Sequence, residues 1–381
     1  MRLHAGNTAR TILFVCDFNG HGGTQTHLMS LFAAIDKSRY RPWLAALSLE
    51  ADLARRLQTI DVEVANLGLG GALRLHTAGS VRGLAKEASR RGVDFIQGYL
   101  FSGNLVAAAV SMLSGIPCMT SVRNIDIWKK RRHRVASALA HRRARHVLFN
   151  SSAVRRQVVR REWIDEAKTS IIHNSVVDPR EGEDTRQTAA GLEFSGNIGG
   201  PIVVCVASLR RKKGHSHLLA AFALVKQRIP GARLLLVGEG PQRASLTREA
   251  ARAGLAQAVV FAGYREDVAA ILACCDLFVL ASLEEGMPNA LLEAMAAGLP
   301  AVVTDVGGNA EALVDGETGY VVPAGNPGAL AARMIEILLN PGLRRAQSEA
   351  ARRRYENSFT LDRMIDTYQT LYDQLLGQTA G

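Results

Sequence analysis

The chain alternates short apolar runs with segments whose apolar residues recur at helical spacing, along almost its whole length. Runs such as TILFVC and DFIQGYL have the length of buried strands, and each precedes a helix-like segment. Strands buried on both faces and separated by helices are typical of a parallel sheet. In the first half we expect strands at 11–16, 94–100, 117–122 and 146–150, and helices at 25–35, 104–113 and 151–159.

The alternation stops between residues 178 and 200, where the sequence is polar, rich in glycine and charge, and without a clear period. A second series then begins at PIVVCVAS and continues to PAVVTDV. The expected fold is therefore α/β, with two doubly wound, Rossmann-like parallel-sheet domains. Ligands of such sheets bind beyond the carboxyl ends of the strands, so we expect one active site in a cleft between the domains. The predicted segments are a first domain at 1–178, a linker at 179–200, a second domain at 201–355 and a C-terminal helix at 356–381.

The length and composition of the chain are typical of a globular protein. Its 381 residues suggest two domains, and 48% are hydrophobic against 21% charged, which excludes a disordered chain. No uninterrupted apolar run is long enough for a membrane span, and the first ten residues lack the apolar core of a secretion signal. Five cysteines without a CxxC pair are expected to be buried, reduced thiols rather than disulfides or metal ligands. The expected location is cytoplasmic.

The positive charge is concentrated in one segment, residues 129–161, which we call the basic block. It holds 12 Lys and Arg and no Asp or Glu, whereas the formal net charge of the whole chain is +11, so the remainder is nearly neutral. A solvated face is one interpretation. The others are anionic partners: a membrane surface, a phosphorylated acceptor or nucleic acid.

The first strand is followed by a glycine-rich turn containing Gly20, Gly22 and Gly23. Glycines there let the backbone approach a ligand, and the N-terminus of the next helix offers free N–H groups to an anion. A dinucleotide fingerprint requires a glycine at position 25, where this chain has Gln25, so nicotinamide binding is not favoured.

Four cations, Arg210 to Lys213, follow the first strand of the second series and precede Gly214. They are either an exposed basic turn or a binding site for a diphosphate, because clustered cations repel one another unless solvent or an anion compensates them.

The stretch SLEEGMPNALLEAM places Glu285 before a helix expected to start near Pro288, and Glu293 within that helix. Carboxylates accept hydrogen bonds from the vicinal hydroxyls of sugars and ribose, and the N–H groups of Gly286 and Met287 suit an anionic or polar group. A helix-capping role explains the loop acid and does not explain Glu293.

These motifs together resemble glycosyltransferase family 4, the retaining glycosyltransferases of GT-B fold. The matching segments occur in the family's order and span almost the whole chain. They are GHGGTQTH at 20–27, HNSVVD at 173–178, VASLRRKKGHSHLLAAF at 206–222, LLLVGEGPQR at 234–243, the E-x7-E region at 284–311 and VDGETGYVVPAGNP at 314–327.

The resemblance implies that the N-terminal half binds the acceptor and the C-terminal half binds a nucleoside diphosphate sugar, with a UDP-sugar as the expected donor. In this family the C-terminal segment commonly crosses back onto the N-terminal domain, and the amphipathic helix at 356–381 fits either that course or an ordinary terminal helix. It implies that Glu285 contacts the transferred sugar, Glu293 the ribose and Lys213 the diphosphate. No metal or other cofactor is implied, because cationic side chains and helix ends take its place. The implied catalytic residues are Glu285, Lys213 and Arg123, and the implied donor-binding residues are Gly22, Gly23, Ser208, Arg210, Lys213, Glu239, Glu285, Gly286, Met287 and Glu293.

Two departures from the family pattern stand out. Ser208 occupies the place of an arginine five residues before the lysine, and Arg210 or Arg211 is the candidate substitute. Arg123 stands near the place of a histidine that follows the strand at 117–122; Asn124 and Asp126 are further candidates there.

The function expected is retaining transfer of a hexosyl or N-acetylhexosaminyl group to a glycan or lipid-linked acceptor, in the synthesis of a surface polysaccharide or glycoconjugate. Docking of the basic block on an anionic membrane is expected to place the enzyme at the inner face of the membrane. Two alternatives remain: a sugar-nucleotide epimerase of the same fold, and a nucleic-acid-binding protein that uses the basic block. The block holds no aromatic residue except Phe149, which disfavours base stacking.

Overall fold

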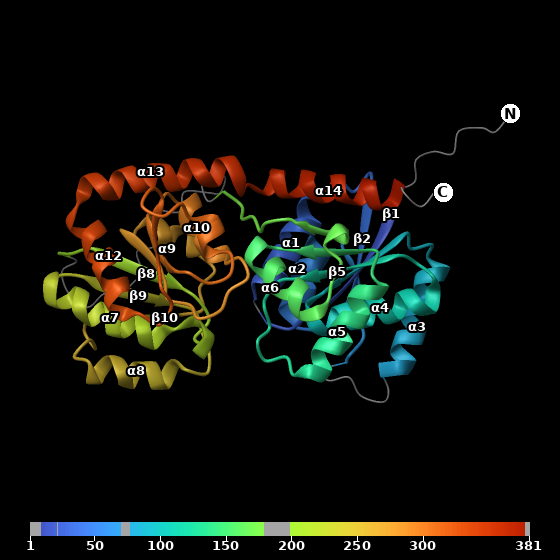
Figure 1. Cartoon of the computed structure of the whole chain (residues 1–381), viewed down its shortest axis with the longest axis horizontal. Helices are drawn as coiled ribbons and strands as arrows, with labels where there is room; N and C mark the ends of the chain where they lie inside the picture. Colours follow the sequence, from blue (N-terminus) through green and yellow to red (C-terminus); the bar gives the residue numbers. More distant parts are fainter. Residues whose placement is uncertain (1–8, 21, 70–76, 179–198, 378–381) are drawn as a thin grey trace. The chain divides into compact units, whose positions relative to one another are not determined.

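The computed structural model describes residues 9–20, 22–69, 77–178 and 199–377. It divides the chain into two compact units (Figure 1). Unit 1 comprises Met1–Asn174 with Leu361–Gly381, and unit 2 comprises Ser175–Thr360. The predicted linker at 179–200 lies outside the described residues except for its last two positions.

Unit 1 contains, among its described residues, a seven-stranded parallel sheet in the order β3-β2-β1-β4-β5-β6-β7. All four strands predicted in the first half are present, which confirms the α/β pattern. The strands are β1 Arg10–Phe18, β2 Tyr40–Leu49, β3 Glu63–Asn66, β4 Phe95–Tyr99, β5 Cys118–Val122, β6 His146–Phe149 and β7 Thr169–Ile171.

Helices cover both faces of this sheet, because alternate residues of a strand point to opposite sides. Phe14 and Cys16 of β1 pack with α1, α2 and α14, whereas Leu13 and Val15 pack with α3 and α4. Ser151 caps α6 as predicted, accepting a hydrogen bond from the Val154 N–H at 3.2 Å. The helices are α1 Gly23–Ala34, α2 Ala51–Thr59, α3 Thr77–Arg90, α4 Leu100–Ser114, α5 Arg131–Arg143, α6 Ser152–Glu162 and α14 Leu361–Gly377.

Unit 2 repeats the architecture with a six-stranded parallel sheet, in the order β10-β9-β8-β11-β12-β13 among its described residues. Its strands are β8 Ile202–Val206, β9 Arg233–Val237, β10 Val259–Gly263, β11 Leu277–Leu280, β12 Ala301–Thr304 and β13 Gly319–Val322. Its helices are α7 His215–Arg228, α8 Arg243–Arg252, α9 Val268–Ala273, α10 Asn289–Ala296, α11 Asn309–Ala312, α12 Pro327–Leu339 and α13 Pro341–Ser358.

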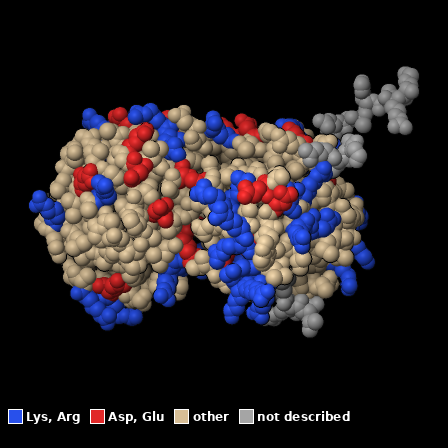
Figure 2. All heavy atoms as spheres, viewed as in Figure 1, with Lys and Arg blue, Asp and Glu red and all other residues tan. Residues whose placement is uncertain are grey.

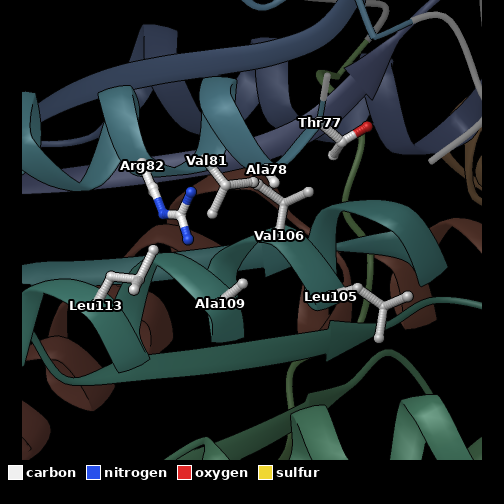
Figure 3. Close-up of a pocket in the computed structure, with 8 residues that line it drawn as sticks. All are labelled: Thr77, Ala78, Val81, Arg82, Leu105, Val106, Ala109 and Leu113. Atoms are coloured by element: carbon white, nitrogen blue, oxygen red, sulfur yellow. The ribbon is translucent and has the colours of Figure 1, made fainter. Parts of the chain in front are cut away.

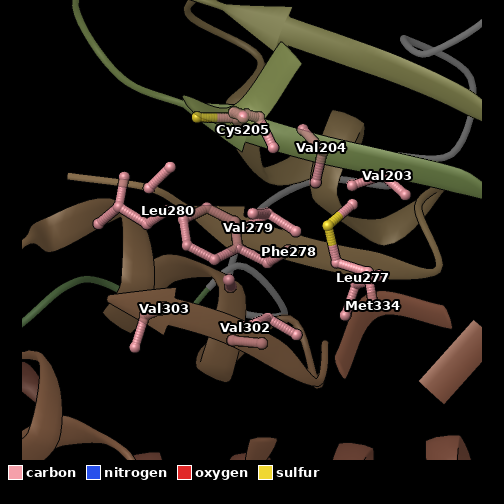
Figure 4. Packing of buried hydrophobic residues seen from close by; sticks show 14 of the residues in the cluster. Val203, Val204, Cys205, Leu277, Phe278, Val279, Leu280, Val302, Val303 and Met334 are labelled. Carbon is pink, nitrogen blue, oxygen red and sulfur yellow. The ribbon is translucent and has the colours of Figure 1, made fainter. Parts of the chain in front are cut away.

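The core of unit 2 is built from its central strands and the helices on them. Figure 4 shows Met334 of α12 beside side chains of β8, β11 and β12, all of which belong to one buried cluster. Such strands are apolar at every position, as Phe278 and its neighbours are, because both faces of the sheet are covered. Polar side chains are therefore confined to the strand ends.

The last helix, α14, belongs to unit 1 and packs against α1. Its tyrosines enter a buried polar network: Tyr368 Oη lies 2.9 Å from His27 Nε2 and 3.2 Å from Tyr99 Oη. Tyr372 Oη donates to Gln97 Oε1 at 2.5 Å. The network joins the end of the chain to the centre of the first sheet. No described helix is both long and apolar enough to cross a membrane.

We expect Tyr372→Phe to lower the free energy of unfolding by about 1–3 kcal/mol, because it leaves the buried Gln97 carbonyl without its donor. Urea denaturation would measure the change. Thr367→Val on the exposed face of the same helix is the control, and it is expected to change stability by less than about 0.5 kcal/mol. Equal midpoints for the two variants would contradict a stabilising role for the network.

Candidate functional site

The candidate donor site lies at the point in the second sheet where the chain reverses its direction of strand addition. From β8 the chain continues to β9 on one side, and β11 continues to β12 on the other. The connections that leave the carboxyl ends of β8 and β11 therefore diverge, and this divergence creates the crevice in which open α/β sheets bind ligands. The predicted residues Ser208 to Lys213 follow β8, and Glu285 follows β11.

Lys213 and Glu285 form an ion pair across this switch point. Lys213 Nζ donates to Glu285 Oε1 at 2.5 Å, and Ser282 Oγ donates to the same oxygen at 2.7 Å. Glu285 is buried and Lys213 is partly buried. Charge-assisted hydrogen bonds of this kind are strong and fix the carboxylate in one orientation. Sequence reasoning did not identify Ser282, although it begins the stretch that contains both glutamates.

Gly214 explains how the two loops come so close. Its φ is +64°, and a Cβ built there would lie 1.9 Å from the carbonyl oxygen of Ala281. Only glycine permits both the left-handed backbone and this approach. The contact is reinforced by the Leu283 N–H, which donates to the Lys212 carbonyl at 2.7 Å.

The loop of Glu285 is enclosed from the opposite side by the residues after β12. A Cβ at Gly307 would lie 2.2 Å from the Glu285 carbonyl oxygen, and the Gly308 N–H donates to the Gly286 carbonyl at 2.5 Å. Thr304 Oγ1 donates to the Ser282 carbonyl at 2.6 Å. Backbone contacts on both sides therefore hold the loop of Glu285 in place, and the predicted donor-binding residues Gly286 and Met287 are buried in the same loop.

Glu293 lies in the second turn of α10, whose N-cap is Pro288, as the sequence predicted. It is partly buried, and burial raises the pKa of its carboxyl to about 7. No hydrogen bond joins Glu293 to Glu285 among the described side chains. The two glutamates therefore have separate surroundings: Glu285 is ion-paired with Lys213, whereas burial favours the neutral form of the Glu293 carboxyl.

The remaining cations after β8 differ from Lys213. Arg210 and Arg211 are exposed, so solvent rather than a carboxylate compensates them. Ser208, in the position of the family's arginine, is partly buried in the same loop. Neither arginine is brought to the Lys213–Glu285 pair by a hydrogen bond within the described part of the chain.

Glu239 lies in the GEGPQR loop, which packs against the loop after β8. The Leu209 N–H donates to the Glu239 carbonyl at 2.9 Å, and a Cβ at Gly238 would lie 2.2 Å from the Ala207 carbonyl oxygen. The glycines of this loop therefore serve close backbone packing. The side chain of Glu239 is 52% exposed and pairs with Arg243 at 2.8 Å.

In unit 1, the predicted glycines lie where β1 leads into α1. Gly22 is the N-cap of α1 and supplies no side-chain cap, and Gly23 is its first residue. Gly20 has a left-handed backbone with φ +79°, whereas Gly22 does not. Gln25 Nε2 donates to the Asp17 carbonyl at 2.8 Å and ties the helix to the strand end.

Arg123 follows β5 and is buried in unit 1, with Nη2 donating to Asn174 Oδ1. Asn150 Nδ2 donates to the Arg123 carbonyl at 3.1 Å. Asn124 Oδ1 accepts from the Ile125 N–H at 2.9 Å, a local turn contact. Asp126 has a left-handed backbone; burial raises the pKa of its carboxyl, although Lys129 opposes the shift. Of the three candidates near this place, only Arg123 is deeply buried.

The basic block requires a correction, because Lys129 is not a surface cation. Its ammonium group is buried and lies 3.1 Å from Glu162 Oε1 and 3.4 Å from Asp126 Oδ2. Glu162, immediately after the block, also lies 3.1 Å from His141 Nε2. Desolvation makes an unpaired buried ammonium costly, so Lys129 needs these carboxylates. Phe149 is fully buried in β6, which removes the block's only aromatic residue from any role in base stacking.

The described residues contain no cluster of His, Cys, Asp and Glu able to hold a metal ion. Cys16, Cys118 and Cys205 are buried free thiols as predicted, whereas Cys274 is exposed and Cys275 partly so, because the turn before β11 leaves the core. A cavity of about 380 Å³ lies between α3 and α4, away from the predicted residues (Figure 3). Its walls are mainly apolar, with Val81, Leu105 and Val106 prominent and Arg82 alongside them.

Comparison with known proteins agrees with this geometry. The family model Glycosyltransferase Family 4 matches residues 21–179, and Glycosyl transferases group 1 matches residues 194–354. N-acetyl-alpha-D-glucosaminyl L-malate synthase of Bacillus anthracis is 33% identical over 175 residues, which are 46% of either chain. The Vi polysaccharide biosynthesis protein VipC/TviE of Salmonella typhi is 25% identical over 310 residues, 76% of this chain and 52% of that protein. The chain thus matches about half the length of these curated relatives.

Among solved structures, Anabaena Alr3699/HepE in complex with UDP superposes with a TM-score of 0.82 at 22% identity. The superposition covers 96% of this chain and 100% of HepE. Both sheets of the present chain are therefore those of a known two-domain fold. The two family models, which together cover both sheets, and this fold show that the chain belongs to glycosyltransferase family 4 and has the GT-B fold.

Proposed function

We propose that this chain is a retaining glycosyltransferase that transfers a hexosyl or N-acetylhexosaminyl group from a nucleoside diphosphate sugar to a glycan or lipid-linked acceptor. The observation that carries the proposal is the Lys213–Glu285 ion pair at the switch point of the second sheet. A UDP-sugar is the proposed donor, because HepE was solved with UDP. Synthesis of a surface polysaccharide is the proposed role, in line with the name of the Salmonella relative.

In this proposal, Lys213 and Glu285 contact different parts of the bound donor. The ammonium group of Lys213 contacts the diphosphate, and the carboxylate of Glu285 accepts hydrogen bonds from hydroxyls of the transferred sugar. The bond from the anomeric carbon to the diphosphate breaks as the bond to the acceptor oxygen forms, and the proton of the acceptor hydroxyl passes to the leaving diphosphate. Negative charge then develops on the leaving diphosphate, where a preorganised cation stabilises it without metal.

An activity assay distinguishes transfer from epimerisation. We expect the enzyme to release a nucleoside diphosphate from the matching sugar nucleotide only when an acceptor is present. Thermal stabilisation by a panel of sugar nucleotides would first identify the donor. A change of the sugar nucleotide without any acceptor would instead identify an epimerase.

The acceptor is proposed to be lipid-linked because unit 1 combines exposed apolar side chains with cations. Trp128 is 55% exposed and Leu139 is 61% exposed, and Ile127 and Val135 are exposed with them. Lys and Arg side chains gather over the surface occupied by α5 and α6 (Figure 2). Aromatic and aliphatic residues among cations are typical of surfaces that lie in a membrane interface. We therefore propose peripheral attachment through the exposed part of the basic block.

For the donor site, we expect Lys213→Met to weaken UDP binding by about tenfold or more and uridine binding much less, because only UDP has a diphosphate. Calorimetry with both ligands would measure this. Lys212→Met is the matched control, because its side chain makes no hydrogen bond to a described residue. Equal losses for UDP and uridine would contradict a role in phosphate binding. Arg210→Gln and Arg211→Gln, tested in the same way, would identify the substitute for the arginine absent at Ser208.

For Glu293, we expect uridine affinity to rise by up to about tenfold between pH 6 and pH 8. The pKa of about 7 means that the carboxylate, which is the better acceptor for ribose hydroxyls, forms over this range. Uridine avoids the titration of the UDP phosphate near pH 6. Glu293→Gln should bind more weakly at pH 8 and show a flat profile. The same slope in this variant would assign the titration to another group.

For the membrane surface, we expect wild type to sediment with anionic vesicles at low salt and not with neutral ones, because each surface cation contributes about 1 kcal/mol. Replacing the exposed Lys130, Arg131 and Arg132 by Gln should reduce binding at least tenfold. Gln at the exposed Arg41, Arg55 and Arg56, which lie outside the block, is the charge-matched control. Equal loss for both triple variants, or equal binding to neutral vesicles, would contradict docking through this surface. Lys129 is left intact because Glu162 depends on it.

A further inference from the structure

Two other cations of low exposure, the buried Lys129 and the partly buried Arg352, have a carboxylate partner, whereas Arg123 has none among the described residues. Lys129 pairs with Glu162, and Arg352 donates to Asp178 Oδ1 at 2.8 Å. Arg123 is only 7% exposed, yet the side chains that share hydrogen bonds with its guanidinium are neutral: the amide of Asn174 and the phenol of Tyr368. Its Nη1 is buried and makes no hydrogen bond to any described residue.

Several described groups that interact with the charge of Arg123 are neutral. They include His27, Tyr99 and Tyr368, which lie on the α1, β4 and α14 sides of the arginine. Burial raises the pKa of both tyrosines, so they stay neutral at physiological pH. Burial and the charge of Arg123 together hold the pKa of His27 well below its usual range, so His27 is neutral as well. The guanidinium is thus a buried cation in contact with neutral polar groups, and no ion pair joins it to a carboxylate among the described residues.

A buried charge without a counter-charge lowers stability, and it is retained where a ligand of opposite charge completes the pair. The position of Arg123 suits such a ligand, because it directly follows β5, beside the switch point between β1 and β4. Two residues in this region, Leu100 after β4 and Asp126 after β5, hold left-handed backbones with φ +62° and +52°. Backbone strain of this kind is concentrated at ligand-binding sites.

We propose that Arg123 anchors an anionic group, a carboxylate or a phosphate, that belongs to one of the two substrates of the proposed transfer reaction. The inference rests on the proposed function for the identity of the substrates. The planar guanidinium binds either group through paired N–H donors, which a histidine in this position does not offer. Arg123 is accordingly a residue that determines specificity for an acidic substrate.

The test uses malonate and inorganic phosphate as carboxylate and phosphate probes, at matched ionic strength, with calorimetry on the full chain. Wild type is expected to bind at least one probe, and Arg123→Met to bind it at least tenfold more weakly. Arg352→Met is the control, because it removes a partly buried arginine that already has a carboxylate partner. It should lose stability and keep the affinity for the probe. Equal affinity of wild type and Arg123→Met for both probes, or no binding by wild type, would overturn the proposal.

Three further ligands locate the anion. A loss of UDP affinity in Arg123→Met places it in the donor diphosphate, and a loss confined to UDP-glucuronate, with UDP-glucose unchanged, places it on the donor sugar. A loss confined to malonate or phosphate in saturating UDP places it on the acceptor. Failure of wild type to bind UDP would contradict the proposed function, and the two simple anions still decide the site.

Arg123→Lys provides the test if the methionine variant does not fold. Lysine keeps the charge that Asn174 and the neighbouring phenols surround, and it loses the planar pair of donors. Weaker binding of the same probe by a folded Arg123→Lys protein supports the assignment. Unchanged affinity in this variant would overturn the bidentate anchor.

Discussion

The candidate donor site depends on the close approach of Gly214 to the carbonyl of Ala281. A side chain at residue 214 would require the connection after β8 to move away from the end of β11, because its Cβ would lie 1.9 Å from that oxygen. Lys213 would then lose Glu285, which lies 2.5 Å from its ammonium group. The close backbone contact at Gly214 therefore sets the distance between the ammonium group of Lys213 and the carboxylate of Glu285.

The two sheets place their polar groups by the same rule. Both are parallel and covered on both faces, so most side chains along the strands are apolar, and the buried polar exceptions in the first sheet, Gln97, Thr120 and Ser121, are hydrogen-bonded within unit 1. The candidate binding groups lie at the carboxyl ends. In the second sheet the ends carry Lys213 and Glu285. In the first sheet they carry the uncapped start of α1 and the buried Arg123. The candidate groups of both sheets therefore lie beyond the carboxyl ends of their strands.

The partners of three cations of low exposure indicate whether each has a structural role or is a candidate for ligand binding. Lys129 is held by two carboxylates and joins the start of α5 to the end of α6. Lys213 has one carboxylate and remains partly accessible, which leaves its ammonium group able to meet a diphosphate. Arg123 donates to a neutral amide oxygen, and its buried Nη1 has no hydrogen-bond partner in the described structure. From Lys129 through Lys213 to Arg123, fewer carboxylates compensate the cation, so its burial costs more free energy and binding of an anionic ligand would stabilise it more.

The sequence by itself determined the two-sheet architecture and the positions of the site loops. Apolar runs and glycine-rich turns indicate strands and turns through local sequence alone, without reference to residues that are distant in the chain. The start of α10 at Pro288 and the Ser151 cap of α6 follow from the same local chemistry. Only the tertiary structure decided which charges meet. The partner of Lys213 is 72 residues away, and Ser282 gained its role through the folding of that loop. The block 129–161 looked like one surface in sequence, yet Lys129 turned inward, because Glu162 and Asp126 are brought to it by packing that a linear pattern does not encode.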